Sequence, residues 1–174
     1  MAIKSLIAIL CFITTSAFAG DETENHNPLH DPGWIKSAKE AIPVVLRKYE
    51  TLIQKESREA GIPPQIVTAV LVVESLGRND RKGPAQGLMQ TRLVVAKELG
   101  SNCDRQRPEC SIRKGAQYLA LLRERYGLSI GPELFLGYLK GPQGMRKVRN
   151  PGKHEYSRRI VYVIESLPEG AFSS

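Results

Sequence analysis

The feature of this sequence that most constrains the fold is an almost wholly apolar run, residues 66–73, which ends at Glu74. Such a run offers little polar surface, so we predict a helix that is buried on nearly all sides. Prolines at positions 63 and 64 suit the first turn of that helix, and Gly77 suits its end. Glu74 is then expected in the last turn of a core helix, where partial burial and the negative end of the helix dipole both favour the protonated carboxyl group. A carboxyl group in that state can serve as a general acid.

A carboxylate at a helix end is more often structural than catalytic, and the residues that follow Glu74 decide between these interpretations. Ser75, a polar loop and residues 85–90 (Ala-x-Gly-Leu-Met-Gln) resemble the signature of the lytic transglycosylases of the lysozyme-like superfamily. That signature reads Glu-Ser, a loop, and Gly-Ala-x-Gly-Leu-Met-Gln. In the family the glutamate is the catalytic acid and base, and the Gly-Leu-Met-Gln turn lines the saccharide groove. The resemblance therefore implies a catalytic Glu74 and substrate contacts from Ser75, Met89 and Gln90.

The glycine turn has features that suit a sugar groove. Gly87 is expected to let the backbone approach a sugar closely, Met89 to fill an irregular apolar gap, and Gln90 to offer a donor and acceptors. Without Glu74, the same segment would be interpreted as an ordinary turn that enters the next helix. Two departures accompany the match. Pro84 takes the place of the first glycine of the Gly-Ala pair, in a loop about two residues shorter than usual, and Arg92 stands where many relatives have a second methionine.

Residues 136–144 (Leu-Gly-Tyr-Leu-Lys-Gly-Pro-Gln-Gly) resemble a second family segment, Ala-Tyr-Asn-Ala-Gly-Pro-Gly, which lies opposite the catalytic glutamate. The match implies an active-site role for Tyr138, whose hydroxyl is expected to donate towards Glu74 or the sugar. The alternative is a core tyrosine whose hydroxyl finds another partner. Leu139 replaces the family's asparagine and Lys140 replaces a small residue, so the hydrogen bond of that asparagine is absent here or is made by another group.

Near the end of the chain, Tyr162 and Val163 resemble a Tyr-Val pair from which the family draws another groove tyrosine, with residues 160–161 as an alternative match. Residues 115–119 resemble the family's core segment Gly-x-x-Tyr-Leu. The resemblance thus covers about residues 62–167. It implies a mainly α domain of the lysozyme-like (α+β) superfamily with a substrate groove.

The spacing of apolar residues supports a mainly helical domain. Helical spacing runs from Trp34 to Gly61, with Pro43 marking a kink or a second start. Trp34, at the entry of this helix, is interpreted as packing against the core in preference to stacking on a sugar. Ser111 is expected to cap a helix that ends at Gly127. Further helices are expected over residues 93–100 and 156–167, with a short hairpin near the groove.

The start of the chain has the pattern of a secretory signal peptide over residues 1–19. Lys4 supplies a positive charge, residues 6–13 an apolar core, and Ala-Phe-Ala a small-residue cleavage site. The apolar core is too short to span a membrane. Residues 20–33 are polar and aperiodic, so we expect a flexible leader there. The sequence then predicts an exported, periplasmic protein with one folded domain over residues 34–170.

Cys103 and Cys110 enclose a short loop that contains a proline. In an oxidising compartment such a pair is most simply a disulfide, which stabilises by roughly 2–3 kcal/mol on loop-closure arithmetic. The alternative is a metal site, but no zinc-type spacing occurs and the histidines lie far off in the sequence. We therefore expect a disulfide, and neither a metal nor a cofactor.

The chain carries a formal charge of +7, which favours an anionic partner without choosing one. Nucleic acid is disfavoured by export, by the few aromatic residues and by the lack of a helix-turn-helix, zinc-finger or aromatic stacking signature. Peptidoglycan glycan strands, with their muramic and peptide carboxylates, fit both the charge and the motif. No stable membrane span is expected, and the protein is expected to be a monomer.

The resemblance predicts a lytic transglycosylase that uses one carboxylate and releases a 1,6-anhydro product. Glycosidases of the two-carboxylate type need a second Asp or Glu at a defined separation, and the available candidates, Asp80 and Glu98, are both interpreted as surface residues. Two alternatives stay open. One is a muramidase that admits water. The other is a peptidoglycan-binding component of a secretion or conjugation complex, which Leu139 and the shortened loop bring into consideration.

Overall fold

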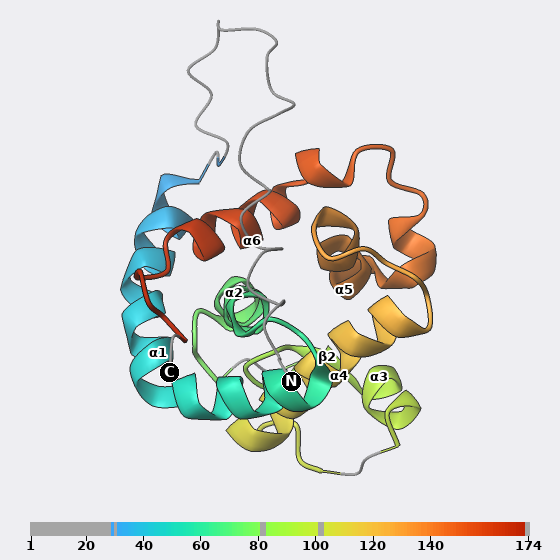
Figure 1. Cartoon of the computed structure of the whole chain (residues 1–174), viewed down its shortest axis with the longest axis horizontal. Helices are drawn as coiled ribbons and strands as arrows, with labels where there is room; N and C mark the ends of the chain where they lie inside the picture. Colours follow the sequence, from blue (N-terminus) through green and yellow to red (C-terminus); the bar gives the residue numbers. More distant parts are fainter. Residues whose placement is uncertain (1–28, 30, 81–82, 101–102, 173–174) are drawn as a thin grey trace, which may run out of the picture.

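The computed structural model describes residues 29, 31–80, 83–100 and 103–172 (Figure 1). The expected signal peptide, 1–19, and most of the expected leader, 20–33, lie outside these residues and stay predictions. Within the described part, no helix combines the length and the apolar character that crossing a membrane requires. This part has six α-helices, and 66% of it is helical, which confirms the predicted mainly α fold class.

Helix α1 (Pro32–Ala60) follows the left side and then the lower side of the domain in Figure 1. Asp31 caps it, because its Oδ1 accepts the backbone N–H of Trp34 at 2.9 Å. Gly61 ends it in the left-handed conformation, with φ of 65°. The helix begins two residues before the start expected at Trp34, and it continues through Pro43 as one element. The predicted second start at this proline is therefore not formed.

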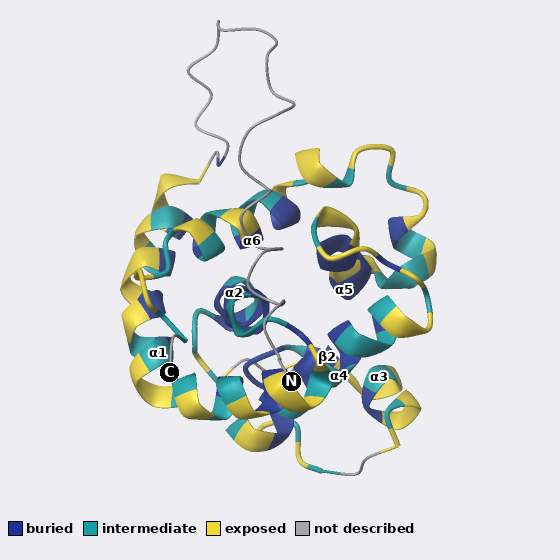
Figure 2. Ribbon diagram, in the orientation of Figure 1, coloured by how far each residue is buried: buried dark blue, intermediate teal, exposed yellow. Residues whose placement is uncertain are grey.

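Helix α2 (Pro64–Ser75) lies at the centre, in contact with α1, α4 (Pro108–Glu124) and α6 (Glu155–Glu165) (Figure 1). All residues from 66 to 72 are buried, as the apolar run predicts. Figure 2 shows α2 largely in the colour of buried residues, whereas the outer helices are mixed. Leu76 and Gly77 end the helix with φ of 53° and 71°. Glu74 therefore lies in the last turn of the core helix, where the sequence places it.

The remaining elements form the walls around the end of α2. A short antiparallel hairpin pairs Ala85 with Arg92 and Gln86 with Thr91, which confirms the predicted hairpin. Helix α5 is interrupted at Gly141, which has φ of 71° and ψ of 167° and precedes a proline. The bounds are β1 (Ala85–Gln86), β2 (Thr91–Arg92), α3 (Leu93–Glu98), α5 (Pro132–Met145) and the 3-10 helix η1 (Pro151–Lys153).

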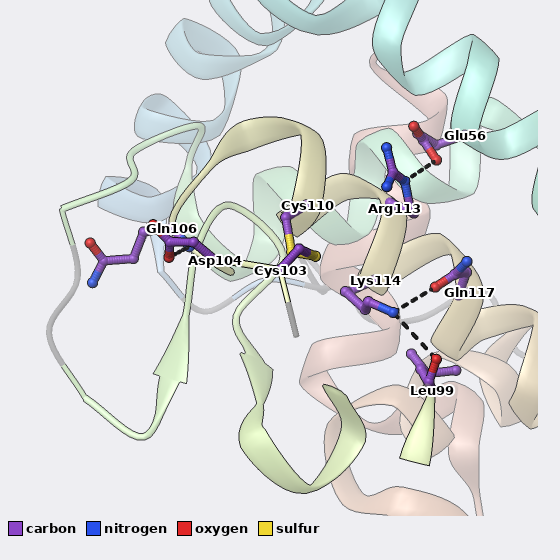
Figure 3. The surroundings of a disulfide bond; sticks show 9 residues. All are labelled: Glu56, Leu99, Cys103, Asp104, Gln106, Cys110, Arg113, Lys114 and Gln117. Atoms are coloured by element: carbon purple, nitrogen blue, oxygen red, sulfur yellow. Dashed lines mark hydrogen bonds and ion pairs between the residues drawn. A yellow bond between two sulfur atoms is a disulfide. The ribbon is translucent and has the colours of Figure 1, made fainter. Parts of the chain in front are cut away.

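A disulfide between Cys103 and Cys110 joins the loop before α4 to the first turn of that helix (Figure 3). The predicted pairing is thus confirmed. The prediction that Ser111 caps this helix is wrong, because α4 already begins at Pro108 and Ser111 lies inside it. The Ser111 hydroxyl instead accepts the backbone N–H of Met89 at 3.0 Å. A residue expected to start a helix therefore holds the glycine turn in place.

Two further side chains of α4 tie it to its neighbours (Figure 3). Arg113 Nε lies 3.3 Å from Oε2 of the buried Glu56 on α1. Lys114 is also buried, and its Nζ donates to the Leu99 carbonyl at 3.5 Å and to Oε1 of Gln117 at 3.1 Å. Burial lowers the pKa of Lys114, and the charge of Arg113 lowers it further. These contacts hold α4 against α1 and against the end of α3.

Candidate active site

Glu74 lies where two hollows of the surface meet. The first, here called the hairpin hollow, has a volume of about 280 Å³ and is walled by the hairpin, α3, α4 and α5. The second, here called the α6 hollow, has a volume of about 330 Å³ and is walled by the ends of α2 and α6. Both are lined by Glu74 and Leu139. The half-buried carboxyl group of Glu74 therefore faces a groove that continues on both sides of it.

A tyrosine that the sequence did not single out binds Glu74. The hydroxyl of Tyr156 donates to Oε1 of Glu74 at 2.6 Å. Tyr156 lies in the first turn of α6, and Nδ1 of His154 accepts its backbone N–H at 3.2 Å as the cap of that helix. Burial raises the pKa of Tyr156 well above its ordinary value of 10.0, and the charge of Glu74 and the hydrogen bond to it raise the pKa further. The tyrosine is therefore a protonated donor at neutral pH.

Tyr162, which the resemblance had placed in the groove, lies elsewhere. Its ring packs edge-on against Trp34 with 6.0 Å between ring centroids, and it lines neither hollow. The buried residues of α6 include Tyr156, Ile160 and Val163, which recur at helical spacing on the inner face. Tyr162 is off this stripe. The periodicity of the last helix could therefore have identified Tyr156, whereas matching a Tyr-Val pair pointed to the wrong tyrosine.

Tyr138 lines the hairpin hollow but does not make the expected bond to Glu74. Its hydroxyl donates to the Met89 carbonyl at 2.7 Å, and its ring lies 5.3 Å from that of Tyr118. Burial raises the pKa of Tyr138 well above 10.0, and the nearby charge of Glu74 raises it further. A hydroxyl has one hydrogen to donate. The hydroxyl of Tyr138 therefore holds the glycine turn, while the residue remains part of the wall of the hairpin hollow.

The glycine turn presents Gln90 to the groove and buries Met89. Met89 is fully buried, and a Cβ added at Gly115 would lie 2.4 Å from its Cε, so the methionine fills an apolar gap as predicted. That burial removes Met89 from the expected set of direct substrate contacts. Gln90 has φ of 47°, lines the hairpin hollow, and donates from Nε2 to the Gly87 carbonyl at 2.7 Å.

A glycine is required at position 87 because other parts of the protein pack closely behind it, and not because a sugar approaches it, as was expected. Its φ is 80°, and an added Cβ would lie 2.0 Å from the Arg105 carbonyl oxygen and 2.4 Å from Oγ of Ser111. The guanidinium group of Arg105 donates to the Thr91 carbonyl and, at 3.4 Å, to that of Pro84. The loop closed by the disulfide thus supports both ends of the hairpin, a role that no local pattern indicates.

Ser75 is likewise part of the scaffold. It is fully buried, and its hydroxyl donates to the Leu71 carbonyl at 3.1 Å and accepts the Gly77 N–H at 3.2 Å. These bonds satisfy backbone groups at the end of α2. The structure therefore places Ser75 beside the catalytic candidate but not in contact with the groove, which corrects the expected substrate contact.

The comparison with known families bears directly on this arrangement. The family model of the transglycosylase SLT domain matches residues 51–160, which is more than half of the chain. The chain belongs to this family. The matched range holds Glu74, Gln90, Tyr138 and Tyr156, and the six helices confirm the lysozyme-like fold of the SLT domain. Among curated proteins, no sequence matches the chain.

An SLT domain implies lytic transglycosylase activity on peptidoglycan, and hence binding to that polymer. A peptidoglycan-acting domain that carries a disulfide indicates an extracytoplasmic location. In the part of the chain that the structure describes, no three side chains of His, Cys, Asp or Glu gather as a metal site would require.

The two hollows of the SLT domain differ in charge. The hairpin hollow is lined by two cations, Arg92 and Lys140, with Glu74 as its carboxylate. In the α6 hollow, Arg159 forms an ion pair with Glu155, so those charges compensate each other. The positive character of the groove is therefore concentrated on the hairpin side of Glu74.

Proposed function

We propose that this protein is a lytic transglycosylase that cleaves the β-1,4 bond between N-acetylmuramic acid and N-acetylglucosamine, with Glu74 as acid and then base. The observation that carries the proposal is the place of Glu74. In a chain of the SLT family, this half-buried carboxyl group lies where the two hollows meet and accepts a hydrogen bond from a buried tyrosine.

The reaction begins with Glu74 protonated. The carboxyl group donates its proton to the glycosidic oxygen, the bond to the muramyl anomeric carbon breaks, and the N-acetylglucosamine portion leaves. The carboxylate that remains is stabilised by the Tyr156 hydroxyl, which donates to Oε1. A buried tyrosine with a raised pKa can make this bond without giving up its own proton.

The second half returns the proton to Glu74. The carboxylate takes the proton of the muramyl 6-hydroxyl as that oxygen attacks the anomeric carbon of the same sugar. A 1,6-anhydro ring forms, and no water is consumed. The attacking hydroxyl is tethered to the carbon that it attacks, so it is present at high effective concentration. One carboxyl group of the protein is enough for both proton transfers.

The carboxylates near the groove support this single-residue mechanism. Among the described residues that line the two hollows, the other carboxylate is Glu155, which is paired with Arg159. Glu98 is bonded to Arg125 and Tyr126, and neither Glu98 nor Asp80 lines either of these two hollows. Inverting and retaining hydrolases of the two-carboxylate type both need a second carboxyl group at the sugar. An intramolecular nucleophile removes that need.

We propose that Gln90 and Tyr138 face the substrate in the hairpin hollow, and that Ser75, Met89 and Tyr162 act behind the groove surface. We also propose that residues 1–19 direct export and that the domain over 34–170 acts in the periplasm as a monomer. The family, the disulfide and the apolar start of the sequence support that location. A small exported domain of this kind suits local opening of the wall for a secretion or conjugation complex.

The proposal is tested by incubating protein that begins at Gly20 with purified sacculi and identifying the released muropeptides by mass. We expect anhydro-muropeptides from the natural sequence and from Glu124→Gln, whose carboxylate is exposed on α4. Glu74→Gln should release almost none while still binding sacculi, because an amide cannot donate the proton. Substantial turnover by Glu74→Gln would remove this residue from the mechanism.

Digestion in oxygen-18 water separates the transglycosylase from the muramidase. Attack by the 6-hydroxyl leaves no solvent oxygen in the product, whereas attack by water labels the new muramyl end. Label at that position would replace the proposed reaction with hydrolysis. Binding to sacculi without any released product from the natural sequence would instead favour the binding-protein alternative.

A further inference from the structure

The hairpin hollow is lined by two positive charges from different elements. Arg92 comes from strand β2 and Lys140 from helix α5, and both line the same hollow as Glu74. Both side chains are exposed. Within residues 31–80, 83–100 and 103–172, neither cation forms an ion pair or a side-chain hydrogen bond, whereas Arg159 in the α6 hollow is bound to Glu155 and Asp31. Two uncompensated cations therefore face one half of the groove.

Apolar side chains lie on the same rim. Val94, at the start of α3, is 67% exposed, and Leu139, next to Lys140, is 43% exposed, and both line the hairpin hollow. Both side chains are open to pack against an alkyl group of a ligand in this hollow, which would remove apolar surface from water. The rim thus combines positive charge with apolar surface, whereas the floor has the polar groups of Gln90 and Glu74.

This combination matches the peptide of peptidoglycan better than its sugars. Glycan hydroxyl and N-acetyl groups are neutral, so they give no reason for two unpaired cations. The peptide attached to muramic acid has carboxylates and alkyl side chains, and it extends away from the sugar chain. The two cations are exposed on the rim of the hollow and are not buried on its floor. A group that leaves the groove would pass the rim.

We propose that Arg92 and Lys140 form an anion subsite, here called the rim subsite, that binds a carboxylate of the peptide attached to muramic acid. The rim subsite makes the protein select peptide-bearing glycan over glycan whose peptides have been removed. This inference rests on the proposed function for the identity of the polymer, and it adds the part of the polymer that is recognised. Neither residue takes part in proton transfer.

The test measures binding separately from turnover. In protein carrying Glu74→Gln, the affinity for a soluble disaccharide-peptide is compared by calorimetry with that for the same disaccharide without peptide, which keeps a free lactyl carboxylate. We expect Arg92→Gln and Lys140→Gln each to weaken binding of the disaccharide-peptide by about threefold to fivefold, the range of exposed ion pairs. The loss should shrink at high salt. Binding of the peptide-free disaccharide should change little.

The double variant Lys147→Gln with Arg149→Gln is the matched control, because it removes the same charge from exposed residues that line neither hollow. It is compared with the double variant Arg92→Gln with Lys140→Gln. Equal losses in these two double variants would mean general electrostatic attraction and would overturn the rim subsite. Equal losses for both ligands would mean that the cations do not distinguish the peptide, and this result would overturn the rim subsite. It would also be overturned if the natural sequence bound both ligands with equal affinity. Sacculus digestion stays a separate readout. A retained peptide preference without anhydro products would leave the rim subsite standing and refute the proposed reaction.

Discussion

Replacing Gly87 by alanine tests whether the glycine turn is fixed by the loop behind it. The added Cβ would lie 2.0 Å from the Arg105 carbonyl oxygen, which is backbone, and 2.4 Å from Oγ of Ser111. Something must shift, and overpacking of this kind costs about 1–3 kcal/mol. The φ of 80° adds about 1–2 kcal/mol for a side chain in the left-handed region. We expect the free energy of unfolding to fall by about 2–5 kcal/mol.

Gly61→Ala separates the two contributions. Gly61 has φ of 65°, and no atom lies within 4 Å of its added Cβ, so only the backbone contribution of about 1–2 kcal/mol should appear. Urea unfolding followed by far-ultraviolet circular dichroism measures both variants. The difference between them should be about 1–3 kcal/mol, and Gly87→Ala should also lose activity on sacculi because the hairpin is displaced. Equal losses of stability in the two variants would refute the inference that Arg105 and Ser111 fill the space behind the turn.

Three other changes probe the site. Tyr156→Phe should lower activity by about tenfold to hundredfold, since a hydrogen bond to a charged group contributes about 1.5–3 kcal/mol. Tyr162→Phe removes a buried hydroxyl with no partner among the described residues and should have little effect. Similar losses in the two variants would contradict the assignment of Tyr156 as the partner of Glu74. Burial lowers the pKa of His154 and the charge of Lys140 lowers it further, so the cap of α6 is intact above pH 6.5 and its stabilisation is lost as pH falls through the lowered pKa. Thermal unfolding across acidic pH should show a smaller loss of stability in His154→Asn, because an asparagine cap does not titrate. An unchanged pH profile would exclude the histidine as the source of the loss. Replacing Cys103 and Cys110 by serine should lower the free energy of unfolding by roughly 2–3 kcal/mol. Turnover should also fall under conditions where the variant stays folded, and full activity in the folded variant would show that the hairpin does not depend on the disulfide.

The parts of the site that follow from local patterns could be predicted from the sequence. The run that ends at Glu74 has only one stable placement, in the core, and that placement fixes where the carboxyl group emerges. The glycine turn and the hairpin follow from residues adjacent in the sequence. The disulfide follows from the spacing of two cysteines and from the export that the start of the sequence predicts. In each case the cause and its consequence lie within a few residues of each other.

The parts that depend on distant packing could not be predicted in the same way. The bond from Tyr156 to Glu74 joins residues 82 apart in the sequence. Arg105 reaches the Thr91 carbonyl 14 residues away. Ser111 has the pattern of a helix cap and Tyr138 that of a donor to Glu74, yet both hydroxyl groups bond the backbone of Met89. A local pattern does not reveal which distant backbone group a hydroxyl will meet. Only the packing of α4, α5 and α6 around α2 determines those partners.

The division between a buried scaffold and an exposed rim has an evolutionary consequence. Positions that match the family pattern, such as Met89 and Tyr138, are buried, whereas the departures at Arg92, Leu139 and Lys140 are exposed. Exposed substitutions usually change stability by no more than about 0.5 kcal/mol, while buried ones commonly cost several times that. Successive mutations at the rim can therefore accumulate without a folding defect. A lineage with this domain can adapt to walls of different composition by substitutions at three surface positions while its catalytic centre stays unchanged.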